Sequence, residues 1–170
     1  MLFRSSLLAS VKAQPDRPAV ICPEDELTYA ELNRRVNRVC ALLLAHGVQA
    51  GDRVAYLLPT GPELIEVYYA IQYVGATAVP LNLRSIPREV SYLVRSSGAG
   101  VLVYADCCAD IVRAADLDGV TLVTCGPSDV PTPYMPMTTG YSGSCAARRF
   151  ISVRRCSTVW ETLKSCAAVS

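Results

Sequence analysis

The chain has 170 residues, of which 51% are apolar and 18% charged, a composition that suits a folded domain and excludes a disordered chain. Its net charge of +1 gives no support to a nucleic-acid-binding protein or to a protein that binds acidic membranes. The charge is uneven, because residues 1–133 carry 11 Lys and Arg against 14 Asp and Glu (net −3), whereas residues 134–170 carry 5 against 1 (net +4).

Helix and strand signals alternate from the N-terminus onward. Residues 5–13 predict a short helix, and residues 19–22 and 27–29 predict the two strands of a β-hairpin. Thr28 and Glu31 have the spacing of a capping box, in which each side chain satisfies a backbone N–H at the start of a helix. We therefore expect a helix directly after the hairpin.

This helix has one apolar stripe and one arginine-rich side, and it should end at Gly47. The stripe consists of Leu32, Val36, Val39, Cys40 and Leu43. Arg34, Arg35 and Arg38 lie off the stripe, where a solvated face explains them better than an anion-binding site does.

After residue 51, short apolar strands alternate with amphipathic helices. The expected strands cover residues 54–58, 76–80, 101–105 and 121–125. The expected helices run from Pro62 to Gly75, from Pro87 to about Ser97, and around Cys108–Ala115. This alternation predicts an α/β fold with a mainly parallel sheet and flanking helices.

Several polar and aromatic side chains in this region have a catalytic or ligand-binding interpretation and a structural one. Tyr69 and Tyr73 widen the apolar stripe of the second helix, which favours core packing over stacking on a ligand. Residues 24–26 form an acidic hairpin turn, and Glu63 and Glu66 lie in the opening turn of a helix, where acids interact well with the dipole. Local structure thus explains all of them without catalysis.

The regular pattern stops after residue 125. Residues 126–137 contain four prolines between 126 and 136 and predict an extended linker. Residues 138–170 have no sustained period and predict an irregular, disordered tail, in which Ile151, Val153 and Val159 are candidates for a short strand or helix. The expected organisation is therefore an α/β region over 1–125, a linker and a tail.

The eight cysteines, at 22, 40, 107, 108, 125, 145, 156 and 166, contain no C-x-x-C pair, which favours scattered reduced thiols over a disulfide framework. Cys22, Cys40 and Cys125 sit in apolar stretches, where a thiol behaves as a small hydrophobe. His46 is the only histidine, so no His–Cys metal set and no Ser–His–Asp triad is proposed. The N-terminus shows neither a secretory signal nor a membrane span, and we expect a cytoplasmic chain.

The common phosphate-binding and nucleophile signatures do not occur. The only lysines, Lys12 and Lys164, do not follow a glycine-rich loop, and no G-x-G-x-x-G follows an expected strand. The run GYSGS differs from the nucleophile elbow G-x-S-x-G at its last position. Spacing alone therefore indicates an α/β domain without an assigned chemistry.

Four sequence blocks carry a resemblance. The blocks are LTYAEL (27–32), HGVQAGDRVAYLLPTGPE (46–63), YYAIQYVGATAVPLN (68–82) and PREVSYLVRSSGAGVLVYAD (87–106). In order and spacing, residues 14–125 resemble the opening of the adenylate-forming (AMP-binding) acyl-CoA synthetases. The similarity is strongest to fatty-acid and medium-chain acyl-CoA ligases, and aryl-CoA ligases and peptide-synthetase adenylation domains begin in a similar way.

The resemblance implies an incomplete N-terminal α/β subdomain of the adenylate-forming synthetase fold. It also implies a two-step reaction, in which a carboxylate and ATP give an acyl-adenylate and pyrophosphate, and coenzyme A then displaces AMP. ATP, Mg²⁺ and coenzyme A are implied for the full-length family, with Mg²⁺ neutralising the phosphates. In that family the matched region is mostly scaffold, so no cofactor and no catalytic residue is expected in these 170 residues.

One run resembles the phosphate loop of that family, which reads approximately [YF]-T-S-G-T-T-G-x-[PS]-K-G. Thr138, Thr139, Gly140 and Ser142 match this pattern, and they are the expected remnant of a cofactor-binding loop. Gly143 stands where the family has lysine, and Met-Pro-Met precedes the run in place of a strand ending in Thr-Ser-Gly. Without that cation the loop would hold phosphate weakly.

Three interpretations remain open at this point. The first is a truncated and inactive acyl-CoA ligase scaffold. The second is a minimal ligase whose nucleotide site needs a partner chain. The third is a non-catalytic interaction module that self-associates through uncovered apolar surface. The change in composition after about residue 126 also fits a shifted reading frame or an alternative exon, which the coding DNA would test.

Overall fold

The computed structural model describes residues 2–22, 25–125 and 151–152. Its elements follow the chain as α1 (Leu2–Ala13), β1 (Pro18–Cys22), β2 (Asp25–Thr28), α2 (Tyr29–Ala45), β3 (Arg53–Leu57), α3 (Pro62–Val74), β4 (Thr77–Pro80), α4 (Pro87–Ser97), β5 (Val101–Ala105), the 3₁₀ turn η1 (Asp106–Cys108), α5 (Ala109–Ala114), β6 (Thr121–Cys125) and β7 (Ile151–Ser152).

Most of these elements were expected from the sequence, and α4, β5 and β6 have the expected bounds. Two helices differ. α1 begins at Leu2 instead of residue 5, since no Gly or Pro interrupts this stretch. The helix expected around Cys108–Ala115 is divided into η1 and the short α5, which stops where Ala115 becomes extended (φ −83°, ψ 145°).

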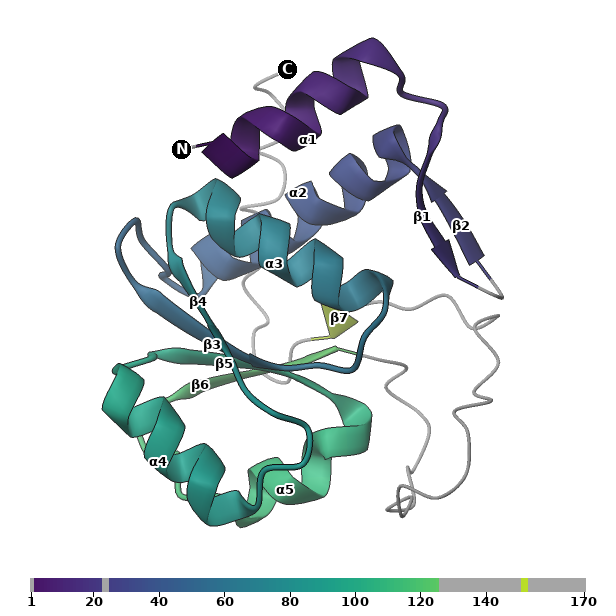
Figure 1. Ribbon diagram of the computed structural model, residues 1–170. Helices are drawn as coiled ribbons and strands as arrows, with labels where there is room; N and C mark the ends of the chain where they lie inside the picture. The colour runs from purple at the N-terminus through teal and green to yellow at the C-terminus, as the bar shows by residue number, and fades with distance from the viewer. Residues whose placement is uncertain (1, 23–24, 126–150, 153–170) are drawn as a thin grey trace.

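The main sheet has the strand order β4-β3-β5-β6-β7. β3, β4, β5 and β6 are parallel, and β7 is antiparallel to β6. The connection from β3 to β4 through α3 leads to one edge, whereas the connection from β4 through α4 returns past β3 to β5. α3 and α4 lie on opposite faces of the sheet (Figure 1), so the winding direction reverses between β3 and β5.

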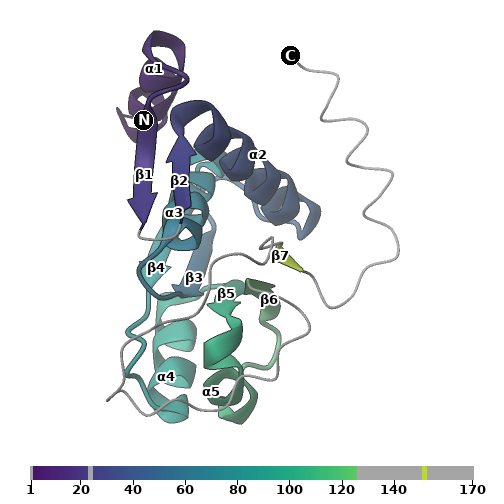
Figure 2. The same ribbon diagram turned by 90° about the vertical axis from the view of Figure 1, so that its right-hand side faces the viewer.

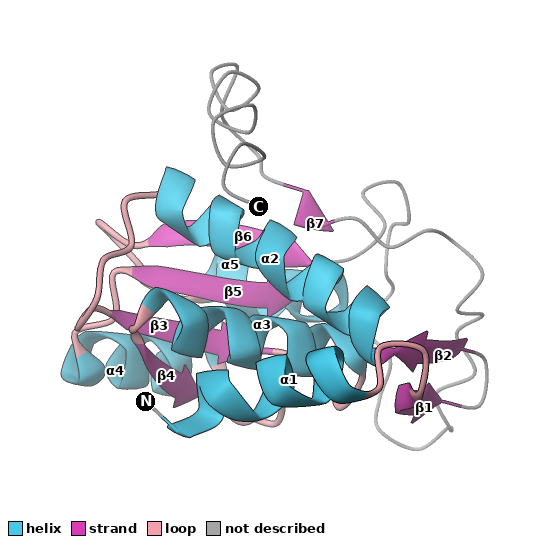
Figure 3. Cartoon of the chain, turned by 90° about the horizontal axis from the view of Figure 1, so that it is seen from above, coloured by secondary structure: helices cyan, strands magenta, loops and turns pink. Residues whose placement is uncertain are grey.

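Each face of the sheet contributes to its own hydrophobic core. Val54 and Tyr56 of β3 belong to the core formed with α1, α2 and α3. Ala55 and Leu57 belong to the core formed with α4 and α5. This period-two division of one strand explains its continuous apolar sequence, and the helices cover the sheet from both sides (Figure 3). The arrangement confirms the expected α/β class with a mainly parallel sheet.

The first hairpin stands apart from the main sheet. β1 and β2 pair antiparallel, with Val20 opposite Leu27. Figure 2 shows this hairpin beside α1 and α2, far from α4 and α5. Val20 and Leu27 are both buried in the core of the first three helices, so the hairpin closes one end of that core.

The capping box at the start of α2 is confirmed. Thr28 Oγ1 accepts a hydrogen bond from the Glu31 N–H at 3.2 Å, and the Thr28 N–H donates to Glu31 Oε2 at 3.1 Å. The bond from the Thr28 backbone, with help from its hydroxyl, lowers the pKa of Glu31. The charged carboxylate thus stabilises the first turn of α2.

The two sides of α2 are mostly as expected, with one correction. Leu32, Val36, Val39 and Leu43 are buried, and Cys40 is half-buried. Arg34 and Arg38 are exposed. The expectation that Arg35 also belongs to a solvated face is wrong, because its side chain is 35% exposed and pairs with Glu66 of α3.

α3 begins at Pro62 and ends at Gly75, as predicted. Gly75 adopts the left-handed conformation (φ 82°) and ends the helix. Tyr69 and Tyr73 are half-buried against the core, and the Tyr73 hydroxyl donates to Asn33 Oδ1 at 3.5 Å. Core packing of these tyrosines is therefore confirmed.

Two further properties belong to the described residues. Five cysteines carry free thiols there: Cys22, Cys40, Cys107, Cys108 and Cys125. Within residues 2–22, 25–125 and 151–152, no helix combines the length and the apolar character needed to cross a bilayer.

Candidate functional site

The winding direction reverses between the neighbouring strands β3 and β5, and this marks the side of the sheet at which the parallel strands have their carboxyl ends. In open α/β sheets, ligands bind outside the carboxyl ends of the strands at the point where the winding direction changes. β3 ends at Leu57 and β5 ends at Ala105, and these two strands are hydrogen-bonded neighbours. We take this carboxyl edge as the candidate functional site.

The segment after β3 leads into the N-terminus of α3. Leu58 is buried, Thr60 is exposed, and Gly61 precedes the first helical residue, Pro62. Gly61 has no side chain with which to cap the helix, so the first-turn N–H groups depend on other partners. The positive end of the 13-residue α3 dipole therefore lies at this edge, with Glu63 in its first turn.

The segment after β5 brings three polar side chains to the same edge. Asp106 accepts a hydrogen bond from Thr124 Oγ1 at 2.5 Å, which joins the ends of β5 and β6. Cys107 is exposed and Cys108 is 3% exposed, and their sulfur atoms lie 3.8 Å apart. The sequence pattern predicts no role for this cysteine pair.

The end of β6 and the short strand β7 also lie here. Cys125 is the partner of Ile151 in the antiparallel register, and Thr124 is the partner of Ser152. The chain therefore leaves the sheet after Cys125 and returns to it at β7, which pairs with Thr124 and Cys125. Thr138, Thr139, Gly140 and Ser142 belong to the intervening residues 126–150, which lie outside the described part, and the phosphate-loop interpretation stays a prediction.

A buried ion pair lies one helical turn from the edge. Glu66 of α3 is 6% exposed, and its Oε1 lies 3.4 Å from Arg35 Nη1 of α2. Burial raises the pKa of Glu66 to about 7, because the loss of hydration exceeds the stabilisation that Arg35 provides. The expectation that Glu66 lies in the opening turn of the helix is wrong, because only Glu63 lies in the first turn of α3 and Glu66 joins α3 to α2 through Arg35.

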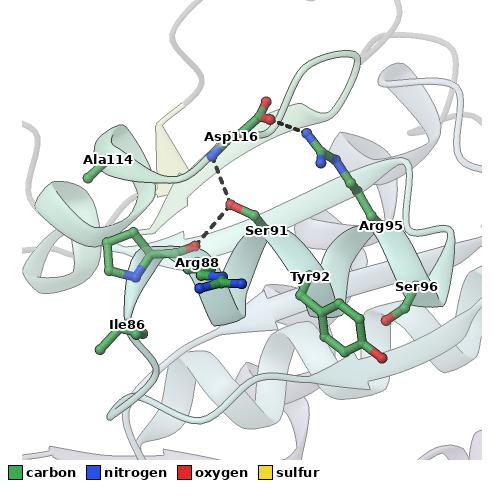
Figure 4. Close-up of a pocket in the computed structure, with 9 residues that line it drawn as sticks. Ile86, Arg88, Ser91, Tyr92, Arg95, Ser96, Ala114 and Asp116 are labelled. Atoms are coloured by element: carbon green, nitrogen blue, oxygen red, sulfur yellow. Dashed lines mark hydrogen bonds and ion pairs between the residues drawn. The ribbon is translucent and has the colours of Figure 1, made fainter.

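A groove of ≈ 880 Å³ lies on the other side of the sheet (Figure 4). It is lined by Ile86, Pro87, Arg88, Ser91, Tyr92, Arg95, Ser96, Ala114 and Asp116. Ser91 Oγ donates to the Pro87 carbonyl at 2.9 Å and accepts from the Asp116 N–H at 2.8 Å, and Arg95 pairs with Asp116. These polar groups satisfy one another, and the groove contains no strand residue, so it is separate from the carboxyl edge.

The described residues lack the groups that Mg²⁺ and phosphate would need together. Nowhere in this part of the chain do three His, Cys, Asp or Glu side chains converge as metal ligands would. The carboxyl edge offers the N–H groups of α3 but no lysine, since the only lysine of the described part is Lys12 in α1. These residues therefore do not fit a complete Mg²⁺–nucleotide site.

Two features were missed by sequence reasoning. Arg35 and Glu66 are 31 positions apart, and no local pattern indicates their pairing. Cys107 and Cys108 stand next to each other after a predicted strand, which was the available signal for them. Neither feature belongs to a known phosphate-binding motif.

Comparison with known proteins gives the family. Residues 7–139 match the model of the family described as "AMP-binding enzyme". The chain is 41% identical over 87 residues to a 3-hydroxybenzoate–CoA/4-hydroxybenzoate–CoA ligase of Thauera aromatica, covering 51% of this chain and 17% of that protein. It is 40% identical over 125 residues to a feruloyl-CoA synthase of an Amycolatopsis species, covering 74% of this chain and 26% of that protein.

A solved structure supports the same conclusion. The fatty acyl-CoA synthetase of Mycobacterium tuberculosis superimposes with a TM-score of 0.67 at 33% identity, over 71% of this chain and 25% of that one. The chain thus spans only about a quarter of the relatives' length, or less. The match to the family model covers most of the 170 residues and includes every strand of the parallel sheet. The chain belongs to the AMP-binding enzyme family and carries part of the N-terminal α/β region of its acyl-CoA ligases.

Proposed function

We propose that this chain is the N-terminal scaffold of an ATP-dependent, AMP-forming acyl-CoA ligase and that these 170 residues do not catalyse the reaction by themselves. In the complete reaction, a carboxylate attacks the α-phosphate of ATP to form an acyl-adenylate and release pyrophosphate. The thiol of coenzyme A then attacks the acyl carbon and AMP leaves. The observation that carries this proposal is the family match over the doubly wound sheet.

In this proposal the described residues form the scaffold on which the nucleotide site is built. β3, β5 and β6 end at one edge, and the segment with the phosphate-loop remnant begins after β6. The family match ends at Thr139, so Thr138 and Thr139 lie inside it and Gly140 lies beyond it. We propose that this run descends from a phosphate loop and binds ATP poorly, because Gly143 replaces the cation that would pair with phosphate.

The proposed acid substrate is a fatty or aromatic carboxylic acid. This range follows the names of the similar proteins, which include a hydroxybenzoate–CoA ligase, a feruloyl-CoA synthase and a fatty acyl-CoA synthetase. ATP, Mg²⁺ and coenzyme A are the proposed co-substrates and metal of the complete reaction. We propose the cytoplasm as the location, since free thiols suit a reducing compartment.

Pyrophosphate exchange tests the proposed lack of activity. The purified chain is incubated with ATP, Mg²⁺, labelled pyrophosphate and a panel of fatty and aromatic acids, while circular dichroism verifies that it is folded. The expected result is no acid-dependent label in ATP. Exchange that depends on any one acid would show that the 170 residues form an acyl-adenylate, and it would support the minimal-ligase interpretation.

A second candidate function rests on the exposed side of α4. Ile86 and Tyr92 are 57% and 69% exposed and border the groove of Figure 4, and Leu93 is 36% exposed. Exposed large apolar side chains are a feature of interaction surfaces. The second proposal is therefore a non-catalytic module that associates with a second copy of itself through α4.

A further inference from the structure

Cys107 and Cys108 form a pair of thiols with unequal environments at the carboxyl edge. Their sulfur atoms lie 3.8 Å apart, within hydrogen-bonding distance for sulfur. Cys107 is open to solvent, whereas Cys108 is 3% exposed within the core below α4 and α5. An oxidant in solution can therefore reach the first sulfur, and the second sulfur is already beside it.

The two thiols also differ in acidity. The hydrogen bond from Cys108 lowers the pKa of Cys107 to about 7, although burial and Asp106 oppose this effect. The same bond raises the pKa of Cys108, and burial adds to the rise. Near neutral pH a substantial fraction of Cys107 is therefore thiolate, and in that form the protonated Cys108 donates to it.

Other described cysteines lack this combination. Cys125 is 4% exposed and belongs to the core, and Cys40 donates its S–H to the Ala70 carbonyl at 3.6 Å. Cys22 is half-buried on the hairpin. Sensor cysteines in proteins combine thiolate character and access to solvent with a neighbouring resolving thiol, and Cys107 has all three.

We propose that Cys107 and Cys108 form a peroxide-sensitive dithiol, in which Cys107 is the reacting nucleophile and Cys108 the resolving thiol. The Cys107 thiolate attacks one oxygen of hydrogen peroxide, the O–O bond breaks, and a sulfenic acid and hydroxide form. The sulfur of Cys108 then attacks the Cys107 sulfur, the S–O bond breaks, and the S–S bond forms. The hydroxyl group leaves as water with the proton of Cys108, and the hydroxide from the first step takes up the proton that Cys107 released when it ionised. In total, two thiols and one peroxide give one disulfide and two waters.

The first step prepares the second. The hydrogen bond to Cys107 and the charge of Cys107 both hold the proton on Cys108, and the pKa of Cys108 is raised for these reasons as well as by burial. Conversion of the thiolate to a neutral sulfenic acid removes that charge and weakens that bond. Cys108 then loses its proton more readily and becomes a better nucleophile.

The resulting bond is expected to be easy to reduce. Neighbouring Cα atoms across a trans peptide are about 3.8 Å apart, whereas disulfides usually join Cα atoms about 4.4–6.8 Å apart. A disulfide between adjacent residues is therefore strained, and strained disulfides have oxidising potentials. Cellular thiols would restore the dithiol, so the modification is a reversible one.

Peptide mapping tests the proposal on the full chain. Trypsin cleaves after Arg95 and Arg113, and the peptide 96–113 contains Cys107 and Cys108 and no other cysteine. The reduced chain is treated with hydrogen peroxide at pH 7, alkylated and digested. The expected result is that this peptide loses two hydrogen atoms and resists alkylation at both cysteines until dithiothreitol is added.

Variants assign the two roles. In Cys108→Ser, or in Cys108→Ala if the first variant unfolds, Cys107 should accumulate as a sulfenic acid that dimedone traps. Cys107→Ser should abolish oxidation of the peptide, and the control Cys22→Ser should leave it unchanged. The proposal is overturned if peroxide leaves peptide 96–113 with two alkylatable thiols, drives Cys107 to sulfinic acid without a disulfide, or joins Cys107 to a different peptide.

Discussion

Arg35 Nη1 and Glu66 Oε1 lie 3.4 Å apart and join α2 to α3. The pair is 31 residues apart in sequence, and the carboxylate is almost fully buried. Burial nevertheless dominates over the attraction to Arg35, and the pKa of Glu66 rises from 4.5 to about 7. This pair makes the stability of the helix layer depend on pH.

Replacement of Glu66 by glutamine should remove that pH dependence. A raised folded-state pKa means that the folded chain holds the proton more tightly than the unfolded chain, so Glu66 contributes most to stability below pH 4.5 and loses this contribution as pH rises to about 7. At 1.36 kcal/mol per unit, the loss is on the order of 3 kcal/mol. The free energy of unfolding of the wild type, measured in urea relative to Glu66→Gln, should therefore fall by this order between pH 4.5 and pH 8.

The matched control is Glu26→Gln, which removes an exposed carboxylate on β2. Its difference from the wild type should change little over the same pH range. If Glu66→Gln and the wild type differ by the same free energy of unfolding at both pH values, burial does not raise the pKa of Glu66.

Removal of the capping hydroxyl should weaken the start of α2. Thr28→Ala loses the bond from the Glu31 N–H to Thr28 Oγ1 and should lower the free energy of unfolding by about 1 kcal/mol. Thr28→Ser keeps a hydroxyl at the same position and should lose far less. Equal losses in urea denaturation for the two variants would contradict the role of the capping bond.

The two left-handed glycines that end α3 and α4 should differ in their tolerance of alanine. Gly75 has φ 82°, and an added Cβ would lie 3.2 Å from Ala50 Cβ. Gly98 has φ 68°, and its added Cβ would meet Arg53 Nη1 at 3.5 Å, an ordinary contact with a movable side chain. Both variants incur the left-handed penalty of about 1–2 kcal/mol.

Gly75→Ala should therefore have the lower melting temperature of the two, because it adds a close contact to that penalty. Thermal unfolding followed by circular dichroism measures the difference. A melting temperature of Gly98→Ala equal to or below that of Gly75→Ala would contradict the contact at Ala50.

The proposed self-association should depend on Tyr92. Multi-angle light scattering after size exclusion should show a mass that increases with concentration, and Tyr92→Ser should weaken the association about tenfold or more, as loss of a large aromatic contact does. Leu44→Ser is the control, because Leu44 is 52% exposed on α2 at the other face of the sheet. A monomeric wild type, or equal weakening by both variants, would reject association through α4.

The elements were predictable where their signals are local. Pro62 and Gly75 mark the ends of α3 in the sequence, and the Thr28–Glu31 spacing marks the start of α2. The helical period predicts which apolar residues of α2 and α3 share the buried face of their helix, and most of these residues are buried in the structure. Parallel strands followed by helices then leave few possible topologies.

The site was less predictable because it depends on contacts between residues that are far apart in the sequence. The role of Arg35 is decided by the packing of α2 on α3, which brings Glu66 to it, and no local period contains this information. For the cysteine pair, adjacency is visible in the sequence, but the exposure of Cys107 and the burial of Cys108 follow from the 3₁₀ turn after β5. Thr138, Thr139 and Gly140 lie outside the described residues, and their role stays a prediction.

The scaffold role of this chain is tested most directly by a chimeric protein in which it replaces the matching segment of a relative. Residues 1–125 replace the matching segment of the Amycolatopsis feruloyl-CoA synthase, to which the chain is 40% identical. A second chimera carries Leu102→Asp at a fully buried position of β5 as a folding control, and it should be inactive. If residues 1–125 are scaffold, the first chimera should form feruloyl-CoA at a rate within about tenfold of the parent, equivalent to about 1.4 kcal/mol in the barrier. A chimera that melts like the parent but shows no ferulate-dependent pyrophosphate exchange would contradict the scaffold role.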